Sequence, residues 1–401
     1  MLIGIFSDTH CGHKHGDERW KDSFIALNEA MDKCLDCDLI LIAGDLFDTR
    51  IPKQESFAKV ARIISKAQNV PNRTQFVESI NKKREDISPL ALRGIPIIAI
   101  HGNHERRSKY MINPVEALEH AGLLLHLKKS TVVFDIDGKK IAVHGMSSVP
   151  ERFAKDVFDE WNPKPIQDAV NILMIHQSVD PYIYTPLEPP SLKLNDIPKG
   201  FDLYIMGHFH WYDKKILHDG QLLITGSTIL TSMNKNEIEK AKVIHKYDGD
   251  IRHIELQDQR KIFFKEFELT FDIRNRIETY LSTISTSTPK PIINIKIRGT
   301  LKQNLQPPRF TDIEEKYKNK GIIIINKRFD REGFEEQVEK LRMFREQKLS
   351  SEEYGLKILQ EKLNEIKCNI KINDIFESLV EGDINLVYNL LTGDQKILGD
   401  I

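Results

Sequence analysis

The sequence predicts an α/β protein in which two packed sheets carry helices on their outer faces. Three observations support this prediction. Short apolar runs, typical of buried strands, alternate with helical patterns over residues 1 to about 260. Five of these runs lead directly into Asp, His or Asn residues. Later strands are joined by hairpin turns such as Asp137-Gly138, and these antiparallel strands are expected to complete a second sheet.

The strand-end residues form a repeated pattern. Residues 39–43 are followed by Gly44 and Asp45. Four other runs end in the same way. The run at residues 2–6 leads to Asp8 and His10, and the run at 95–100 leads to Asn103 and His104. The run at 172–175 leads to His176, and the run at 203–206 leads to His208 and His210. Ligands of open α/β sheets bind outside the carboxyl ends of the strands. We therefore expect these side chains to gather at one edge.

The other elements of the first 260 residues follow from spacing and turn residues. Helices are expected at residues 23–35, 55–67 and 114–122, the last with an early proline and a glycine just after its end. Hairpins are expected within residues 132–143, 216–224 and 243–256. The pattern loosens between residues 68 and 92. The basic cluster at residues 81–84 in that interval is more typical of a solvated face than of a phosphate contact.

The character of the chain changes near residue 260. Strands at residues 265–271, 292–297 and 322–325 alternate with helices at 272–282 and 311–318, which predicts a small βαβαβ domain. Charged helices follow at residues 334–347 and 351–367, then a pair at 374–380 and 383–391 with an apolar stripe. The spacing of the apolar residues in this pair is equally compatible with two interpretations. The pair could pack onto the rest of the protein, or it could dock on a partner. The expected domains are residues 1–260, 261–330 and 331–401.

Composition narrows the class of protein. A net charge of -1 means that any nucleic-acid contact must use local basic patches. No apolar run approaches membrane-spanning length and no targeting segment opens the chain, so we expect a cytoplasmic protein without a membrane segment. Cys34 and Cys37 form a lone CxxC. A zinc ribbon needs a second pair, so we interpret these cysteines as structural.

The strand-end set indicates metal chemistry. Carboxylate oxygens, imidazole nitrogens and an amide oxygen suit a first-row divalent ion such as manganese, iron or zinc. The set is larger than one ion needs, so two ions sharing a bridging Asp is the economical arrangement. Two such ions can clamp the attacking and departing oxygens of a phosphoryl displacement.

Asp8-Thr9-His10, Gly44-Asp45, Gly102-Asn103-His104, His176 and Gly207-His208-Phe209-His210 together resemble the signature of the calcineurin-like metallophosphoesterases. This resemblance covers roughly the first 230 residues and implies a four-layer α/β/β/α sandwich. It implies one metal held by Asp8, His10, Asp45 and His210, and a second held by Asp45, Asn103, His176 and His208, with Asp45 as the bridge. His104 would be catalytic, stabilising the transition state or protonating the leaving oxygen, and not a ligand.

Within that superfamily the chain resembles the double-strand-break repair nucleases of the Mre-eleven and SbcD type, especially archaeal ones. The resemblance lies in residues 7–10, in Gly226-Ser227 with Thr231-Ser232, and in residues 260–269, which lead into a domain similar to a DNA-capping domain. It implies a homodimeric, nucleoid-associated DNA nuclease with two Mn²⁺ ions, an exonuclease or endonuclease acting on double-stranded ends and hairpins. The C-terminal helices would bind a Rad-fifty-type coiled-coil ATPase, which favours partner docking for the final pair.

Three features depart from the pattern. Asp48 stands three residues after Asp45, where many members have His. The interval from Asp45 to Asn103 is longer than usual, and the extra length, near residues 68–92, neighbours the helices that the family uses to dimerise. Cys11, His13 and His15 add potential ligands beside Asp8, and we interpret them as loop residues. His101 and His144, also at strand ends, are interpreted as core or supporting residues.

Two competing functions remain open at this point. A dimetal protein phosphatase or cyclic-nucleotide phosphodiesterase would use the same site, and residues 102–105 resemble protein phosphatases. However, Thr49 and Arg50 follow Asp48 where a phosphatase would have Arg and Gly. A non-catalytic assembly subunit is the second alternative, and the complete ligand set argues against it.

Overall fold

The computed structural model describes residues 1–108, 110–182, 191–232, 235–238, 240–301 and 307–331, with 355–356, 359–360, 363, 372, 375–376, 379 and 387. The chain divides into two compact units. The first holds residues 1–264, 285–294 and 318–323, and the second holds 265–284, 295–317 and 324–401. The helices predicted from residue 334 onward fall almost entirely outside the described residues.

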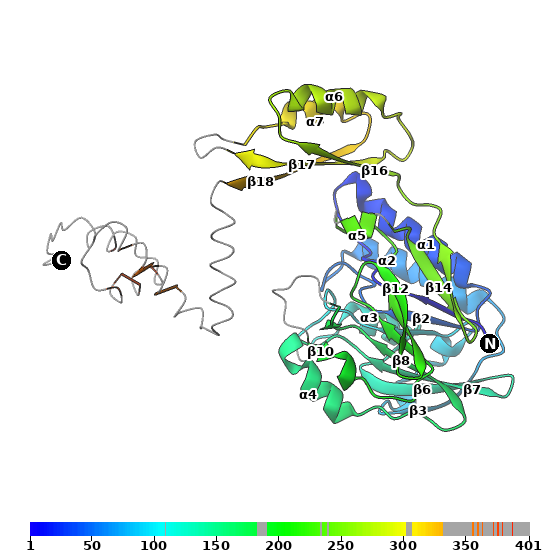
Figure 1. Ribbon diagram of the computed structural model, residues 1–401. Coiled ribbons are helices and arrows are strands. Elements are labelled where there is room, and N and C mark those ends of the chain that lie inside the picture. The colour runs from blue at the N-terminus through cyan, green and yellow to red at the C-terminus, as the bar shows by residue number, and fades with distance from the viewer. Residues whose placement is uncertain are drawn as a thin grey trace, which may run out of the picture. The chain divides into compact units, whose positions relative to one another are not determined.

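The strands and helices alternate as the sequence predicts (Figure 1). The strands are β1 Ile3–Phe6, β2 Leu39–Ala43, β3 Gln75–Ile80, β4 Ile97–Ile100, β5 Leu125–His126, β6 Lys129–Ile136, β7 Lys139–Met146, β8 Ala169–Ile175, β9 Val179–Asp180, β10 Leu192–Lys193, β11 Leu203–Met206, β12 Tyr212–Leu217, β13 Gly220–Thr225, β14 Val243–Tyr247, β15 Ile251–Glu255, β16 Ile262–Glu268, β17 Ile292–Leu301 and β18 Ile322–Arg331. The helices are α1 Asp22–Cys34, α2 Gln54–Ile64, α3 Pro114–His120, α4 Glu151–Trp161, α5 Lys235–Ile238, α6 Ile273–Thr283 and α7 Thr311–Tyr317. Short 3-10 turns are η1 Glu18–Lys21, η2 Ser65–Asn69, η3 Arg84–Asp86, η4 Pro89–Leu92 and η5 Leu194–Asp196.

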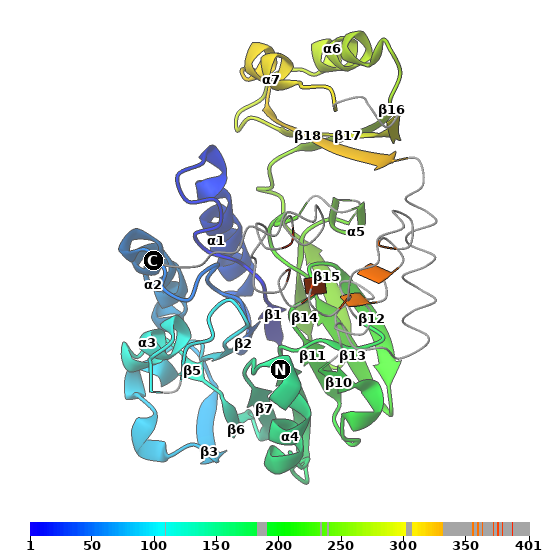
Figure 2. The ribbon, with the colours of Figure 1, turned by 90° about the vertical axis from the view of Figure 1, so that its left-hand side faces the viewer.

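Two sheets form the centre of the first unit (Figure 2). The six-stranded sheet has the order β15-β14-β1-β2-β4-β5, with β1, β2, β4 and β5 parallel. The seven-stranded sheet has the order β12-β13-β11-β8-β7-β6-β3, with β13, β11, β8 and β7 parallel. Residues of both sheets share one buried cluster, so the sheets pack face to face. The two-sheet prediction is therefore confirmed.

The apolar runs are continuous because both faces of each central strand are covered. In β2, Leu41 faces the cluster between the sheets, whereas Ile40 and Ile42 face the cluster under the helices. β11 shows the same alternation, with Ile205 between the sheets and Tyr204 on the outer side. A strand buried on both faces loses the polar alternation of a half-exposed strand.

Helices close the two outer faces. Phe24 and Leu27 of α1 pack with the outer side of the six-stranded sheet. Phe158 and Trp161 of α4 pack with the outer side of the seven-stranded sheet. The layers are therefore α/β/β/α, and the predicted sandwich is confirmed.

The second unit includes most of a three-stranded sheet in the order β16-β17-β18, and α6 and α7 alternate with these strands along the chain. Its core contains Ile277 and Leu281 of α6, Ile297 of β17 and Ile313 of α7, all fully buried. This is the βαβαβ arrangement that the sequence predicts. The domain limits at residues 260 and 330 stay a prediction.

Two further predictions concern membrane-spanning segments and the pair of cysteines at Cys34 and Cys37. No helix in the described ranges is both long and apolar enough to cross a membrane. Cys34 and Cys37 are free thiols buried beneath β1, where a Cβ on Gly4 would lie 2.6 Å from the Cys34 sulfur. Neither thiol belongs to a candidate metal group among the described residues.

Candidate metal centre

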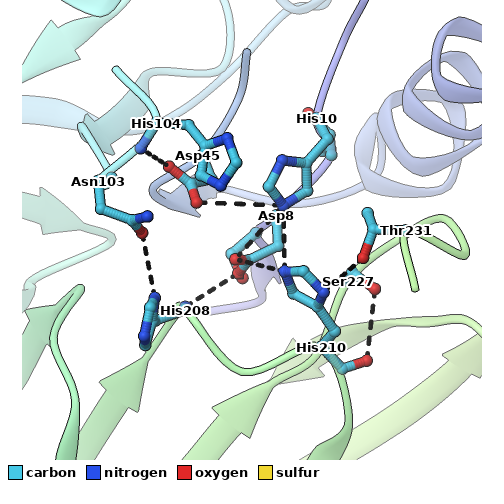
Figure 3. Close-up of polar contacts among 12 residues, drawn as sticks. Asp8, His10, Asp45, Asn103, His104, His208, His210, Ser227 and Thr231 are labelled. Carbon is cyan, nitrogen blue, oxygen red and sulfur yellow. Dashed lines mark hydrogen bonds and ion pairs between the residues drawn. The ribbon is translucent and has the colours of Figure 1, made fainter. Parts of the chain in front are cut away.

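The strand ends meet where the two sheets face each other. β1, β2 and β4 are parallel neighbours in one sheet, and β8 and β11 in the other, so their carboxyl ends bring the predicted side chains together (Figure 3). Asp8, His10, Asp45 and His208 all have positive φ, between 44° and 85°. Such backbone strain in residues other than glycine clusters at functional sites.

One cluster forms around His10 and His210. Their Nε2 atoms lie 3.1 Å apart and face each other. Asp8 Oδ1 lies 3.9 Å from the Nε2 of His10 and 3.7 Å from that of His210. This oxygen is buried and has no hydrogen-bond partner among the described residues. Two converging imidazoles and an unsatisfied carboxylate oxygen fit a divalent cation.

A second cluster forms around Asn103. Its Oδ1 lies 3.1 Å from His176 Nε2 and 3.1 Å from His208 Nδ1. Asp45 Oδ2 lies 3.4 Å from His176 Nε2 on this side and 4.0 Å from His10 Nε2 on the other. Asp45 Oδ2 therefore lies near both clusters, and Asp8 also groups with Asp45 and His176 as a candidate ligand. This geometry fits a divalent dimetal site with a bridging carboxylate.

The electrostatics also favour a cation. Burial opposes the charged form of His176, but the carboxylates of Asp45 and Asp8 outweigh it and raise the pKa of His176 to about 9. Without metal, the buried carboxylates thus hold a proton on that ring. Burial and the charge of His176 lower the pKa of His208 to about 3, so its ring is neutral near pH 7, the form that binds metal.

Outer contacts orient the rings. His176 Nδ1 donates to the carbonyl of Ala43 at 2.7 Å, which turns Nε2 toward Asp45. The carboxylate of Asp48 lies 3.2 Å from His10 Nδ1 and 3.4 Å from His13 Nδ1. Asp48, which the family resemblance left without a role, thus lies within ion-pair distance of both histidines in the structure.

His210 is held by a buried network that the sequence did not indicate. Its Nδ1 lies 2.5 Å from Thr231 Oγ1. Glu237, fully buried at its side chain, accepts from the backbone N–H of Thr231 at 2.7 Å and from Ser232 Oγ at 2.6 Å. Lys242 Nζ lies 3.1 Å from Glu237 and completes the pair. Glu237 and Lys242 are five residues apart, a separation that matches neither a helical nor a strand period, so the sequence pattern did not indicate their contact.

We expect Glu237→Gln to weaken binding of the metal beside His210 by roughly 10–100-fold, the usual effect of losing an outer-shell partner. The neutral amide cannot balance Lys242 or orient Thr231 as the carboxylate does. The measurement is chelator competition followed metal by metal. Glu78→Gln, at an exposed carboxylate of β3, is the matched control. Unchanged affinity at both metals would contradict the assigned positioning.

His104 lies at the open edge of the centre. Its backbone N–H donates to Asp45 Oδ1 at 3.0 Å, and its Nδ1 donates to the carbonyl of Asp48 at 2.9 Å. The ring is exposed and faces His10 edge-on, with ring centroids 4.8 Å apart. His104 also groups with His10 and Asp45 as a candidate ligand set. Its non-ligand role therefore stays a prediction.

Other candidate histidines and Cys11 lie outside these clusters. Cys11 is buried in the core, and His15 stacks edge-on against Trp20. Along with His13, none of these belongs to a candidate metal group in the part of the chain that the structure describes. His101 Nδ1 lies 2.9 Å from His126 Nε2, and His144 Nδ1 lies 2.9 Å from the hydroxyl of Thr131, which are supporting and core positions.

Glu105 is a second residue that sequence reasoning missed. It is fully buried and accepts from the backbone N–H groups of Phe47 at 2.8 Å and Gly102 at 2.9 Å. Burial and the nearby charge of Asp45 raise the pKa of Glu105 to about 8. It ties the loop after β2 to the loop after β4, and thereby fixes Asp45 relative to Asn103. Its position directly after His104 was the only available signal.

The sandwich and the two clusters define a metallophosphoesterase. The chain belongs to the calcineurin-like phosphoesterase family, whose model matches residues 1–212. The resemblance to proteins of the Mre-eleven type is also confirmed: the chain is similar to several curated DNA double-strand break repair proteins named Mre11.

Three archaeal relatives give the extent of this similarity. The protein of Methanopyrus kandleri is 29% identical over 227 residues, 52% of this chain and 44% of that protein. The protein of Sulfolobus acidocaldarius is 26% identical over 319 residues, 75% of this chain and 76% of that protein. The protein of Thermoplasma acidophilum is 25% identical over 319 residues, 74% of this chain and 76% of that protein. The first match spans less than half of its relative.

Proposed function

We propose that this protein is a manganese-dependent DNA nuclease that processes DNA ends in double-strand-break repair. The observation that carries the proposal is the length of the similarity. The family model covers residues 1–212, whereas the match to the Sulfolobus repair protein covers 75% of the chain and so extends beyond the phosphoesterase domain. A phosphatase on the same site would share the metal centre but not the region that follows it.

The ligand assignment follows the two clusters. Asp8, His10, Asp45 and His210 would hold one ion, and Asp45, Asn103, His176 and His208 the other. When bound, two divalent ions polarise the scissile phosphate and activate water for attack. The carbonyl of Asp48 fixes the Nδ1 proton of His104, which leaves Nε2 to face the open site. Protonated His104 would give its Nε2 proton to the departing sugar oxygen.

Cleavage of end-labelled double-stranded and hairpin DNA tests the proposal. Metal-free protein is assayed with manganese, with magnesium and with chelator. We expect cutting with manganese that chelator abolishes. A phosphopeptide and a cyclic nucleotide serve as competing substrates in the same buffers. Faster hydrolysis of either, with no cutting of DNA, would move the assignment to a phosphatase or a phosphodiesterase.

Partners follow from the same proposal. We propose a homodimer that acts at the nucleoid and binds a Rad-fifty-type coiled-coil ATPase through residues 331–401. Among the described residues of that region, Ile375 and Val387 pack with Leu363, whereas Leu379 is 47% exposed. An apolar residue that stays exposed in the predicted helix pair suits a partner contact.

We expect Leu379→Asp to weaken binding of the ATPase while basal nuclease activity is unchanged, because a charge is placed in an apolar contact far along the chain from the metal centre. Pull-down with the purified ATPase and the DNA-cleavage assay give the two readouts. Ile216→Asp, at a 73% exposed apolar residue of β12, is the control. Equal binding by both variants would refute the docking role.

A further inference from the structure

A cavity of about 270 Å³ adjoins the residues that support the metal centre. Arg19 of η1, Gln259 and Arg260 line it, together with Glu237 and Lys242 of the network behind His210. Its volume is several times the roughly 30 Å³ that one water molecule occupies in the liquid. The metal centre does not account for Arg19, Gln259 or Arg260.

The cavity presents unsatisfied donors. Arg19 is only 5% exposed, and its Nη2 donates to the carbonyl of Leu230 at 2.5 Å. Its Nε is buried and has no hydrogen-bond partner in the described ranges, and the same holds for Gln259 Nε2. Arg19 also forms no ion pair within 4.0 Å with any described residue. The carboxylates of Asp22, Asp17 and Glu237 still attract its charge. What is missing is a hydrogen-bond acceptor for the buried Nε, and a buried donor without one is costly.

Two of the three carboxylates that line the cavity are already used, and the third, Glu255, is exposed. The Asp22 carboxylate accepts hydrogen bonds from Arg260 Nη2 at 2.7 Å and from Arg260 Nε at 2.8 Å. The Glu237 carboxylate lies 3.1 Å from Lys242 Nζ. It also accepts hydrogen bonds from the backbone N–H of Thr231 and the hydroxyl of Ser232. The buried carboxylate of Glu237 and that of Asp22 are thus paired, while Arg19 keeps an unused donor. The missing partner is a hydrogen-bond acceptor, and the four cationic side chains against three carboxylates in the lining favour an acceptor that carries negative charge.

We propose that this cavity binds a phosphate group, as free inorganic phosphate or as the phosphate of a mononucleotide. The planar guanidinium of Arg19 offers charge-assisted N–H donors that suit a phosphate oxygen, and Gln259 Nε2 supplies a neutral donor. Lys242, at the cavity wall, adds positive charge. The site needs no metal and differs from the phosphate position that the metal centre would provide.

An occupied cavity would act on the metal centre through the backbone. Arg19 holds the carbonyl of Leu230, and the next residue, Thr231, contacts His210 at 2.5 Å. A phosphate that fixes Arg19 therefore also fixes the loop that orients His210. Phosphate is expected to slow dissociation of the ion beside His210 as a consequence.

Calorimetry on metal-free, full-length protein tests the site. The ligands are inorganic phosphate, deoxyadenosine monophosphate, and deoxyadenosine as the analogue without phosphate. The variants are Arg19→Gln and Gln259→Ala. Lys21→Gln is the matched control because it removes an exposed cation from the same 3-10 turn. Omitting metal separates this test from the proposed nuclease activity.

We expect one phosphate per chain in the unmodified protein and the control, and binding weaker by about tenfold or more in Arg19→Gln, as for loss of one charge-assisted hydrogen bond. Tighter binding of the mononucleotide than of phosphate assigns a nucleotide; equal or weaker binding assigns free phosphate. If Arg19→Gln does not fold, Gln259→Ala decides. No binding by the unmodified protein, or an unchanged Kd in the variants that fold, would overturn the proposal.

Discussion

Replacing His104 by Asn is expected to leave both metals in place while DNA cleavage falls by about 10²–10⁴-fold, the usual contribution of a general acid. The ring is exposed and anchored by its Nδ1 to the carbonyl of Asp48, and the substitution would remove it as the proposed proton donor. The backbone N–H that binds Asp45 survives the substitution. Metal content by mass spectrometry and cleavage rate are measured on the same preparation.

The outcome separates two roles that the geometry allows. His104 also lies near His10 and Asp45 as a candidate ligand. Loss of one metal in the variant would make His104 a ligand and remove the proton-donor role. His120→Asn, at an exposed histidine that ends α3, controls for the general effect of losing an imidazole.

Replacing Asp45 by Ala is expected to reduce binding of both metals together and to abolish cleavage. Asp45 Oδ2 lies within reach of both clusters, 3.4 Å from His176 Nε2 and 4.0 Å from His10 Nε2. Its pKa is held well below the ordinary value, because the charges of His176 and His10 outweigh the effect of burial. The carboxylate therefore stays ionised and available to metal through the whole pH range of an assay.

Metal titration of Asp45→Ala beside Asp86→Ala, which removes an exposed carboxylate, gives the comparison. Retention of two stoichiometric metals would refute the bridge, and selective loss of one would make Asp45 a ligand of a single ion. Circular dichroism distinguishes a site effect from unfolding, since Asp45 Oδ1 also accepts the backbone N–H of His104.

The parts of the fold that the sequence could predict are those with local signals. β2 was predicted with its observed limits because both of its faces are buried, which leaves an uninterrupted apolar run. β3 was missed because it is an edge strand with little burial and pairs only with β6. α4 was missed because it buries only one narrow stripe, including Phe158 and Trp161, among charged residues.

The candidate site divides in the same way. Predicted ligands follow strands, so topology alone brings them together. Glu105 and Glu237 could not be predicted, because their roles depend on contacts set by tertiary structure. Glu105, for example, contacts the backbone of Phe47, 58 residues earlier. Such residues belong to no periodic pattern or motif spacing in the sequence, although their contacts orient the predicted ligands.

The left-handed backbone at Asp8, His10, Asp45 and His208 has a consequence for how this protein tolerates change. Each such residue costs the folded state roughly 1–2 kcal/mol relative to glycine. Glycine at any of these positions would relax the chain and discard a proposed metal ligand at the same time. Selection for thermal stability and selection for catalytic activity therefore oppose each other at these positions. Screens for thermostable variants are expected to yield inactive proteins with substitutions at the strand ends.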